Sequence, residues 1–325
     1  MSIDAGSRRR LERLAGRFGR LVPPHAFVLT RDRLVHVALG DVARASQPSL
    51  GGLKIRSVIL PPGSFREGPG NIGIAGPGLS EALGQVLGKD AKSDVAAASL
   101  SVPDAFVRVV AVDVEPGGDR NAREVEEVLQ WKLDRTFGDG APALRISWLA
   151  AGPVSGGGTR ILGIGTPEEA AASWEGAFAS RGIRIGMIAP EVLAIAPVAK
   201  RALGGEGLFV WAHGGTVSTA FFEDGALRFL RSKPEDPDPG EAVQEIRLFA
   251  SFVAAAGADA GGDGAGAAVA GPASSSVVTG FMQLRKESGA SEPIALWNAL
   301  AARGLASGLG DPAVLAGIGL MTEEA

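Results

Sequence analysis

Cysteine and tyrosine are absent from the chain of 325 residues, and histidine occurs three times. Without cysteine there are no disulfides and no thiolate metal sites, which is compatible with a reducing compartment. His25, His36 and His213 lie far apart in the sequence and lack a partner at metal-ligand spacing, so no metal site is expected. No serine stands in a G-x-S-x-G elbow, and the sequence predicts no catalytic residue.

Long apolar runs and an excess of charge of one sign are also missing. No apolar stretch reaches the roughly 18 residues that span a bilayer, and no secretory signal opens the chain. With 32 basic and 36 acidic residues, the net charge is −4, which gives no electrostatic case for nucleic acid. The hydrophobic share of 46% and a length prior of about 150 residues per domain indicate a globular protein of about two lobes.

Positive charge is nevertheless concentrated in residues 1–24. Apolar residues recur there at helical spacing among the arginines Arg8, Arg9, Arg10, Arg13, Arg17 and Arg20. The favoured interpretation is a solvated N-terminal helix. The alternative is a basic amphipathic segment that rests on anionic lipid or on an acidic partner.

Residues 208–232 are the stretch around which the rest of the chain is organised. A β-prone apolar run ends at Gly214, Gly215 and Thr216, a second such run follows, and Asp224-Gly225 turns the chain back. Glycine allows close approach of the backbone, so the amides of the first turn could face a phosphate. An ordinary glycine hairpin is the alternative.

The other segments predict two α/β units. Strands at 25–30, 34–39, 55–60 and 95–100 with a helix at 78–88 form the first unit. A second unit has strands at 106–114, 144–149, 160–165 and 183–188 and helices at 120–136 and 168–180, in the order βαββαβ. A helix at 191–202 returns to the main body.

Several segments in this order resemble the PilM family of type IV pilus assembly proteins. They are residues 102–108 (VPDAFVR), the helix around Trp131, residues 161–167, the hairpin after 208, and residues 311–320 (DPAVLAGIGL). The PilM family belongs to the actin-like superfamily with the cell-division protein FtsA, and the cytoplasmic domain of the type II secretion protein GspL is a relative. The resemblance implies an actin-like α/β fold (ASKHA, RNase H-like) of two lobes with a small inserted α/β subdomain.

The domain boundaries that follow from this resemblance are a basic segment at 1–24, a first lobe at 25–100 with 190–205 and 311–325, an inserted subdomain at 101–189, and a second lobe at 206–310.

Actin-like proteins hold ATP between two phosphate hairpins and a glycine pair, and this chain departs from all three. The first hairpin, residues 29–33 (LTRDR), lacks glycine, although Arg31 or Arg33 could still contact a phosphate. In the second hairpin Ala212 stands where an acid is usual, which removes a group that would position magnesium or water. At the adenosine strand Gly271 is followed by proline, which has no amide proton.

These departures predict a degenerate nucleotide site. Its residual contacts would come from Gly214, Gly215, Thr216 and Gly271. No cofactor is expected, and the alternative is ATP with magnesium.

In PilM relatives a cytoplasmic segment of the membrane protein PilN is held between the first lobe and the inserted subdomain. The resemblance implies the same cleft here, with Arg108 and Trp131 as candidate lining residues; surface charge and core packing are the alternative roles. The expected function is a cytoplasmic scaffold, peripheral at the inner membrane, of a pilus or type II secretion platform. Its partner would be a PilN-like or GspL-type segment, and self-association stays open. The competing hypothesis is an active actin-like ATPase.

Overall fold

The computed structural model describes most of the chain between residues 23 and 234 and parts of the remainder. The described residues are 23, 25–39, 53–68, 72–88, 95–115, 122–138, 141–154, 157–234, 241, 244, 246–249, 267–270, 281, 294–295 and 312–321. Residues 1–22 and 24 of the predicted basic segment and Gly271 of the predicted nucleotide site lie outside this set.

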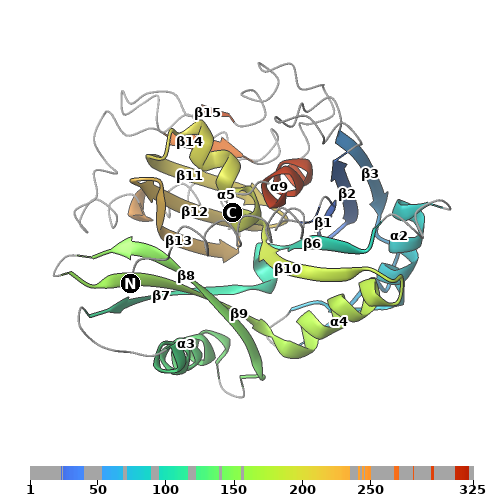
Figure 1. Cartoon of the computed structure of the whole chain (residues 1–325), viewed down its shortest axis with the longest axis horizontal. Helices are drawn as coiled ribbons and strands as arrows, with labels where there is room; N and C mark the ends of the chain where they lie inside the picture. Colours follow the sequence, from blue (N-terminus) through green and yellow to red (C-terminus); the bar gives the residue numbers. More distant parts are fainter. Residues whose placement is uncertain are drawn as a thin grey trace, which may run out of the picture.

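The first sheet has the strand order β10-β6-β1-β2-β3 (Figure 1). Its strands are β1 (His25–Leu29), β2 (Arg33–Leu39), β3 (Leu53–Ile59), β6 (Ala97–Val102) and β10 (Arg184–Pro190). β1 pairs antiparallel with β2 and parallel with β6, which pairs parallel with β10. β1 reads as a continuous apolar run because both of its faces are buried.

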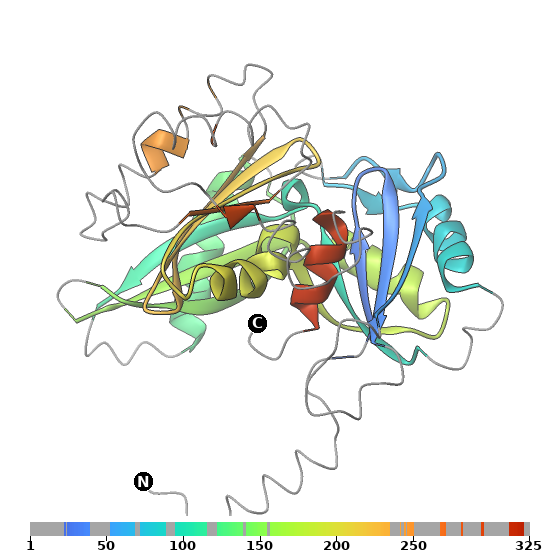
Figure 2. The same cartoon turned by 90° about the horizontal axis from the view of Figure 1, so that it is seen from above.

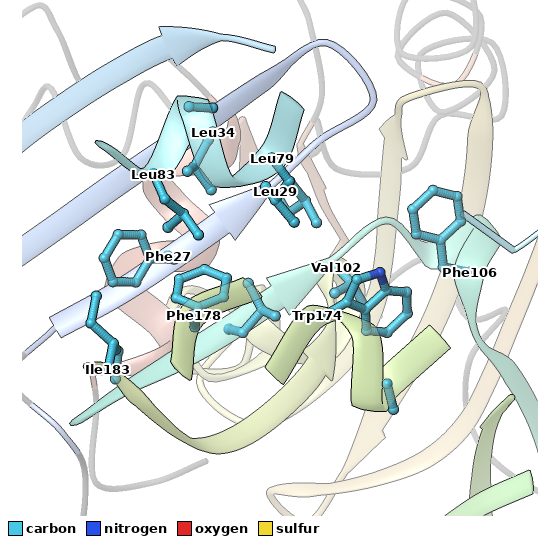
Figure 3. Packing of buried hydrophobic residues seen from close by; sticks show 14 of the residues in the cluster. Phe27, Leu29, Leu34, Leu79, Leu83, Val102, Phe106, Trp174, Phe178 and Ile183 are labelled. Atoms are coloured by element: carbon cyan, nitrogen blue, oxygen red, sulfur yellow. The ribbon is translucent and has the colours of Figure 1, made fainter. Parts of the chain in front are cut away.

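Helices cover both faces of this sheet. α2 (Pro77–Leu87) and α4 (Glu168–Ala179) pack on the face that carries Phe27, while α9 (Pro312–Leu320) packs on the face of Ala26 and Val28. Figure 3 shows Phe178 of α4 and Leu83 of α2 converging on Phe27. Two short strands, β4 (Phe65–Arg66) and β5 (Ile74–Ala75), form a small ladder beside them.

An antiparallel sheet in the order β7-β9-β8 forms a separate unit. Its strands are β7 (Arg108–Val114), β8 (Leu144–Pro153) and β9 (Thr159–Pro167), and η4 (Asp104–Phe106) leads into it from β6. α3 (Ala122–Phe137) covers one face. It lies close because two strand positions are glycine: a Cβ at Gly163 would meet Leu129, and one at Gly165 would meet Leu133.

The sequence places residues 183–188 in this unit as its closing strand, and that prediction was wrong. β10 pairs with β6 of the first sheet instead. The preceding helix α4 also belongs to the first sheet, since Trp174 and Phe178 are buried against it. The three-stranded sheet and α3 therefore span residues 108–167.

The second large sheet has the order β13-β12-β11-β14-β15. It consists of β11 (Gly207–His213), β12 (Thr216–Glu223), β13 (Ala226–Pro234), β14 (Ala267–Ala270) and β15 (Ile294–Ala295). The predicted turns at Gly214-Gly215 and Asp224-Gly225 join β11, β12 and β13 as two-residue hairpins.

α5 (Glu191–Ala202) packs on the second sheet and against α9, which packs on the first sheet. Figure 2 shows the two helices side by side between the sheets. The predicted returning helix at 191–202 is thus confirmed, and it joins the two halves. None of the helices in the described part of the chain has the length and apolarity to cross a bilayer.

Candidate functional site

The two turns predicted to face phosphate lie close together. Gly214 and Gly215 have φ of 61° and 74°, the left-handed conformation that a two-residue hairpin requires. A Cβ placed on Gly215 would lie 3.7 Å from Nη1 of Arg31 in the turn between β1 and β2. The Arg31 guanidinium therefore lies beside the glycine turn.

The turn between β1 and β2 satisfies its own polar groups. The Thr30 hydroxyl donates to Asp32 Oδ1 at 2.7 Å and accepts the Arg33 amide at 3.0 Å. The hydrogen bond from Thr30, followed by the attraction of Arg33, lowers the pKa of Asp32. The one carboxylate of this turn is therefore hydrogen-bonded within the turn, while its side chain is 70% exposed.

Asp104 is a buried acid that the sequence analysis did not identify, and it contacts β12, the strand that follows the glycine turn. Asp104 is 5% exposed; its Oδ1 accepts the Val192 amide at 2.9 Å and its Oδ2 contacts the Ser218 hydroxyl at 2.7 Å. It caps α5, whose own N-cap residue Pro190 makes no side-chain hydrogen bond. Burial, and next the Glu191 carboxylate, raise the pKa of Asp104 to about 7.

Glu191 is the second buried acid, at 2% exposure. Its Oε2 lies 2.6 Å from Nδ1 of His213, the last residue of β11. Its Oε1 is buried and has no hydrogen-bond partner in the part of the chain that the structure describes. His213, which the sequence analysis considers only as a possible metal ligand, therefore belongs to a buried polar cluster with Glu191 and Asp104.

A local pattern could have revealed this cluster. Asp104 follows Pro103 directly after β6, and Glu191 follows Pro190 at the end of β10. β6 and β10 are parallel neighbours, with Val102 opposite Pro190. The carboxyl ends of neighbouring parallel strands bring the residues that follow them to one edge of the sheet.

The cluster does not form a metal site. Within the described ranges, no group of three or more His, Asp or Glu residues could hold a metal ion. Thr216, a predicted nucleotide contact, is 4% exposed at the start of β12. Of the predicted contacts, Gly215 lies beside Arg31, Gly214 and Thr216 are its neighbours in the same hairpin, and Gly271 lies outside the described residues.

A groove of about 330 Å³ separates the first sheet from the inserted sheet. β10 ends the first sheet and β8 ends the inserted sheet, so the groove lies between two edge strands. Arg145 borders it and is held by Glu168 at 2.5 Å and by Glu175 at 2.5 Å. The groove is lined by Val107, Arg145, Ile146, Ser147, Ile164, Thr166, Ala171, Glu175, Gly186, Met187, Ile188 and Pro190.

Neither residue predicted to bind a partner is among the described residues that line this groove. Arg108 is half-buried, donates to the carbonyls of Ala105 and Val107, and lies 5.3 Å from the Phe137 ring centroid. Burial lowers its pKa. Trp131 is 56% exposed and borders a second depression of about 600 Å³, where Arg135 lies over its ring at 5.0 Å.

Similarity to known proteins is visible in structure. No family model and no curated protein sequence matches the chain. A chain of the PilM-PilN type IV pilus biogenesis complex is similar with a TM-score of 0.67 and 16% identity, over 93% of this chain and 98% of that one. The fold is the actin-like fold of PilM.

Two further structures are similar at lower TM-scores. The cytoplasmic domain of EpsL, an inner-membrane component of the type II secretion system of Vibrio cholerae, has a TM-score of 0.43 and 14% identity, over 70% of this chain and 76% of that one. A Bacteroides thetaiotaomicron protein of unknown function with an actin-like ATPase fold has a TM-score of 0.49 and 11% identity, over 81% and 86%.

Proposed function

We propose that this PilM-like chain is a cytoplasmic scaffold of a type IV pilus or type II secretion platform, peripheral at the inner membrane. Its partner is a cytoplasmic segment of a PilN-like or GspL-type membrane protein. The observation that carries the proposal is the groove between β8 and β10, in a fold similar to that of a PilM-PilN complex.

The groove suits an extended peptide. Edge strands offer unpaired amide and carbonyl groups, so a segment can add to a sheet by backbone hydrogen bonds while its side chains enter pockets. Ile146, Ile164 and Met187 supply apolar surface, and Arg145 and Glu175 supply charge at the border. Arg108 and Trp131 stay candidate contacts outside the groove.

The first prediction is that filling the groove weakens peptide binding. Gly186 lines the groove, and a Cβ added there meets no atom of the described residues within 4 Å, so Gly186→Leu adds bulk at the groove. The probe is the N-terminal cytoplasmic peptide of a PilN-like membrane protein, and binding is measured by fluorescence anisotropy. The affinity is expected to fall at least about tenfold, since a blocked groove costs more than about 1.4 kcal/mol.

Gly176→Leu is the matched control. Gly176 lies on α4, is exposed, and likewise has no atom of the described part of the chain within 4 Å of an added Cβ. The affinity of Gly176→Leu for the peptide should stay within about twofold of that of the unsubstituted chain. This corresponds to a change of less than about 0.4 kcal/mol in the binding free energy. Equal peptide affinity for Gly186→Leu and Gly176→Leu would show that the groove is not the binding site. Failure of the peptide to bind the unsubstituted chain would contradict the proposed partner.

The proposal includes a degenerate nucleotide site. Two features of the turns support this part of the proposal: Ala212 supplies no carboxylate to the second turn, and the one carboxylate of the first turn, Asp32, is hydrogen-bonded to Thr30. Magnesium is held by oxygen ligands, and phosphoryl transfer needs a group that positions the nucleophile.

The second prediction concerns ATP. Calorimetric titration with ATP and magnesium should show at best weak binding, with no release of phosphate. Arg31→Ala should leave the titration unchanged if Arg31 merely occupies the space beside the turn. Micromolar affinity with magnesium-dependent hydrolysis would instead establish the competing function, an actin-like ATPase.

A further inference from the structure

The cluster of Asp104, Glu191 and His213 connects three parts of the molecule. Asp104 lies in η4, between the first sheet and the inserted sheet. Glu191 opens α5, which packs on the second sheet, and His213 ends β11 of that sheet. The hydrogen bonds of Asp104 to the Val192 amide and the Ser218 hydroxyl therefore cross from the first half of the molecule to the second.

The hydroxyl groups of Ser218 and Ser232 form a hydrogen-bonded chain that ends on Asp104, and the direction of this chain depends on the protonation of Asp104. Ser218 Oγ lies 2.7 Å from Asp104 Oδ2 and 2.8 Å from Ser232 Oγ. A serine hydroxyl has one proton to donate, so Ser218 donates to one neighbour and accepts from the other. If Asp104 is ionised, Ser232 donates to Ser218 and Ser218 donates to Asp104. If Asp104 is protonated, both hydrogen bonds reverse.

Either direction keeps both hydrogen bonds of the chain, but the charge differs. The ionised form places a second carboxylate beside Glu191, inside a cluster from which water is excluded. The charged groups that face Asp104 are Glu191 from α5 and His213 from β11. Asp32 of the turn between β1 and β2 faces His213 in turn.

We propose that Asp104, Ser218 and Ser232, backed by Glu191 and His213, form a proton-operated latch between the two halves of the molecule. The latch is closed when Asp104 carries a proton. It loosens when that proton leaves, because the buried carboxylate then repels Glu191 and gains hydration by opening. The proposal does not depend on the scaffold function or on any ligand.

The direction and the pH range of the change in junction stability follow from the pKa of Asp104 in the closed form and in the open form. Burial raises the pKa of Asp104 to about 7 in the closed form, against 3.8 for an ordinary aspartate. Opening therefore releases a proton between these two values. The stability of the closed junction is greatest below the lower value, declines as pH rises to about 7, and changes no further above it.

Amide hydrogen exchange of the whole chain, corrected for the intrinsic rate at each pH, tests the latch between pH 5 and 8. Opening at residues 104–107, 191–195 and 213–219 should increase by up to about tenfold per pH unit and level off near neutrality. Asp104→Asn has no proton to release, so its opening should not change with pH. β9 serves as the reference segment, since it lies outside the cluster.

Ser232→Ala tests the same chain in a variant that keeps the acid. Removing the Ser232 hydroxyl leaves Ser218 without an acceptor when Asp104 is protonated, whereas the ionised form loses only a donor to Ser218. An unmet donor costs more than an unfilled lone pair. Opening should therefore level off at lower pH than in the unsubstituted chain. The latch is rejected if Asp104→Asn keeps the original pH dependence, if opening in the unsubstituted chain varies less than about twofold, or if Ser232→Ala leaves the profile unmoved.

Discussion

At the scale of single residues, the histidine pair of the first sheet makes a buried contact that lowers the stability of the fold at acidic pH. His36 is 8% exposed, its Nε2 lies 3.2 Å from Nδ1 of His25, and its ring stacks on Phe27 with centroids 4.5 Å apart. Burial, followed by His25 and Arg56, lowers the pKa of His36 from 6.5 to about 4. The His36 imidazole thus stays neutral in the folded chain, whereas in the unfolded chain it takes up a proton once the pH falls below its ordinary pKa of 6.5.

This contact predicts a loss of stability on mild acidification. The His36 penalty is absent above about pH 6.5 and grows as pH falls towards 4. Between pH 7 and 5, the unsubstituted chain should lose about 2 kcal/mol more than His36→Phe, measured by urea unfolding. Asp104 acts in the opposite direction in both chains, so its contribution cancels in the comparison. Parallel pH profiles for the two chains would show that His36 does not titrate in this way.

At the scale of elements, local patterns gave accurate predictions. Gly214-Gly215 and Asp224-Gly225 are turns because two-residue hairpins need positive φ, and Asp224 has φ of 51°. The helix predicted at 191–202 agrees with α5, since its apolar spacing is local to the segment. Such features depend on neighbours along the chain, which the sequence shows directly.

The errors concern partners far apart in the sequence. The apolar pattern of β10 fits either sheet, and its pairing with β6 joins residues that are 87 or 88 positions apart. β8 continues beyond the predicted 149 to Pro153 through a register shift between Ala150 and Gly152. Asp104 and Glu191 were missed because acids are rarely buried, and only the parallel register of β6 and β10 brings them together.

At the scale of the whole molecule, the inserted unit contacts both halves. On one side it borders the groove against β10. On the other, Arg228 of β13 is buried, its Nη1 donates to the carbonyls of Ala151 and Pro153 in β8, and its Nε forms an ion pair with Glu223 at 3.1 Å. A movement between the large sheets therefore must either carry the inserted unit with it or break these contacts.

Gly152 makes this docking possible. It has φ of 106°, and a Cβ at this position would collide with the Arg228 guanidinium. Arg228→Leu should lower the free energy of unfolding by roughly 3 kcal/mol, since it removes the ion-pair partner of Glu223 and the donor to two carbonyls. Gly152→Ala should cost roughly 2 kcal/mol, partly from the unfavourable φ and partly from the collision.

The collision disappears when both substitutions are combined, so the double variant should be more stable than the sum of the single losses predicts. A coupling of roughly 1 kcal/mol is expected from urea unfolding of all four chains, as for residues in direct contact. Strictly additive losses would mean that Gly152 is required for its backbone conformation alone and that Arg228 does not hold the inserted unit against the second sheet.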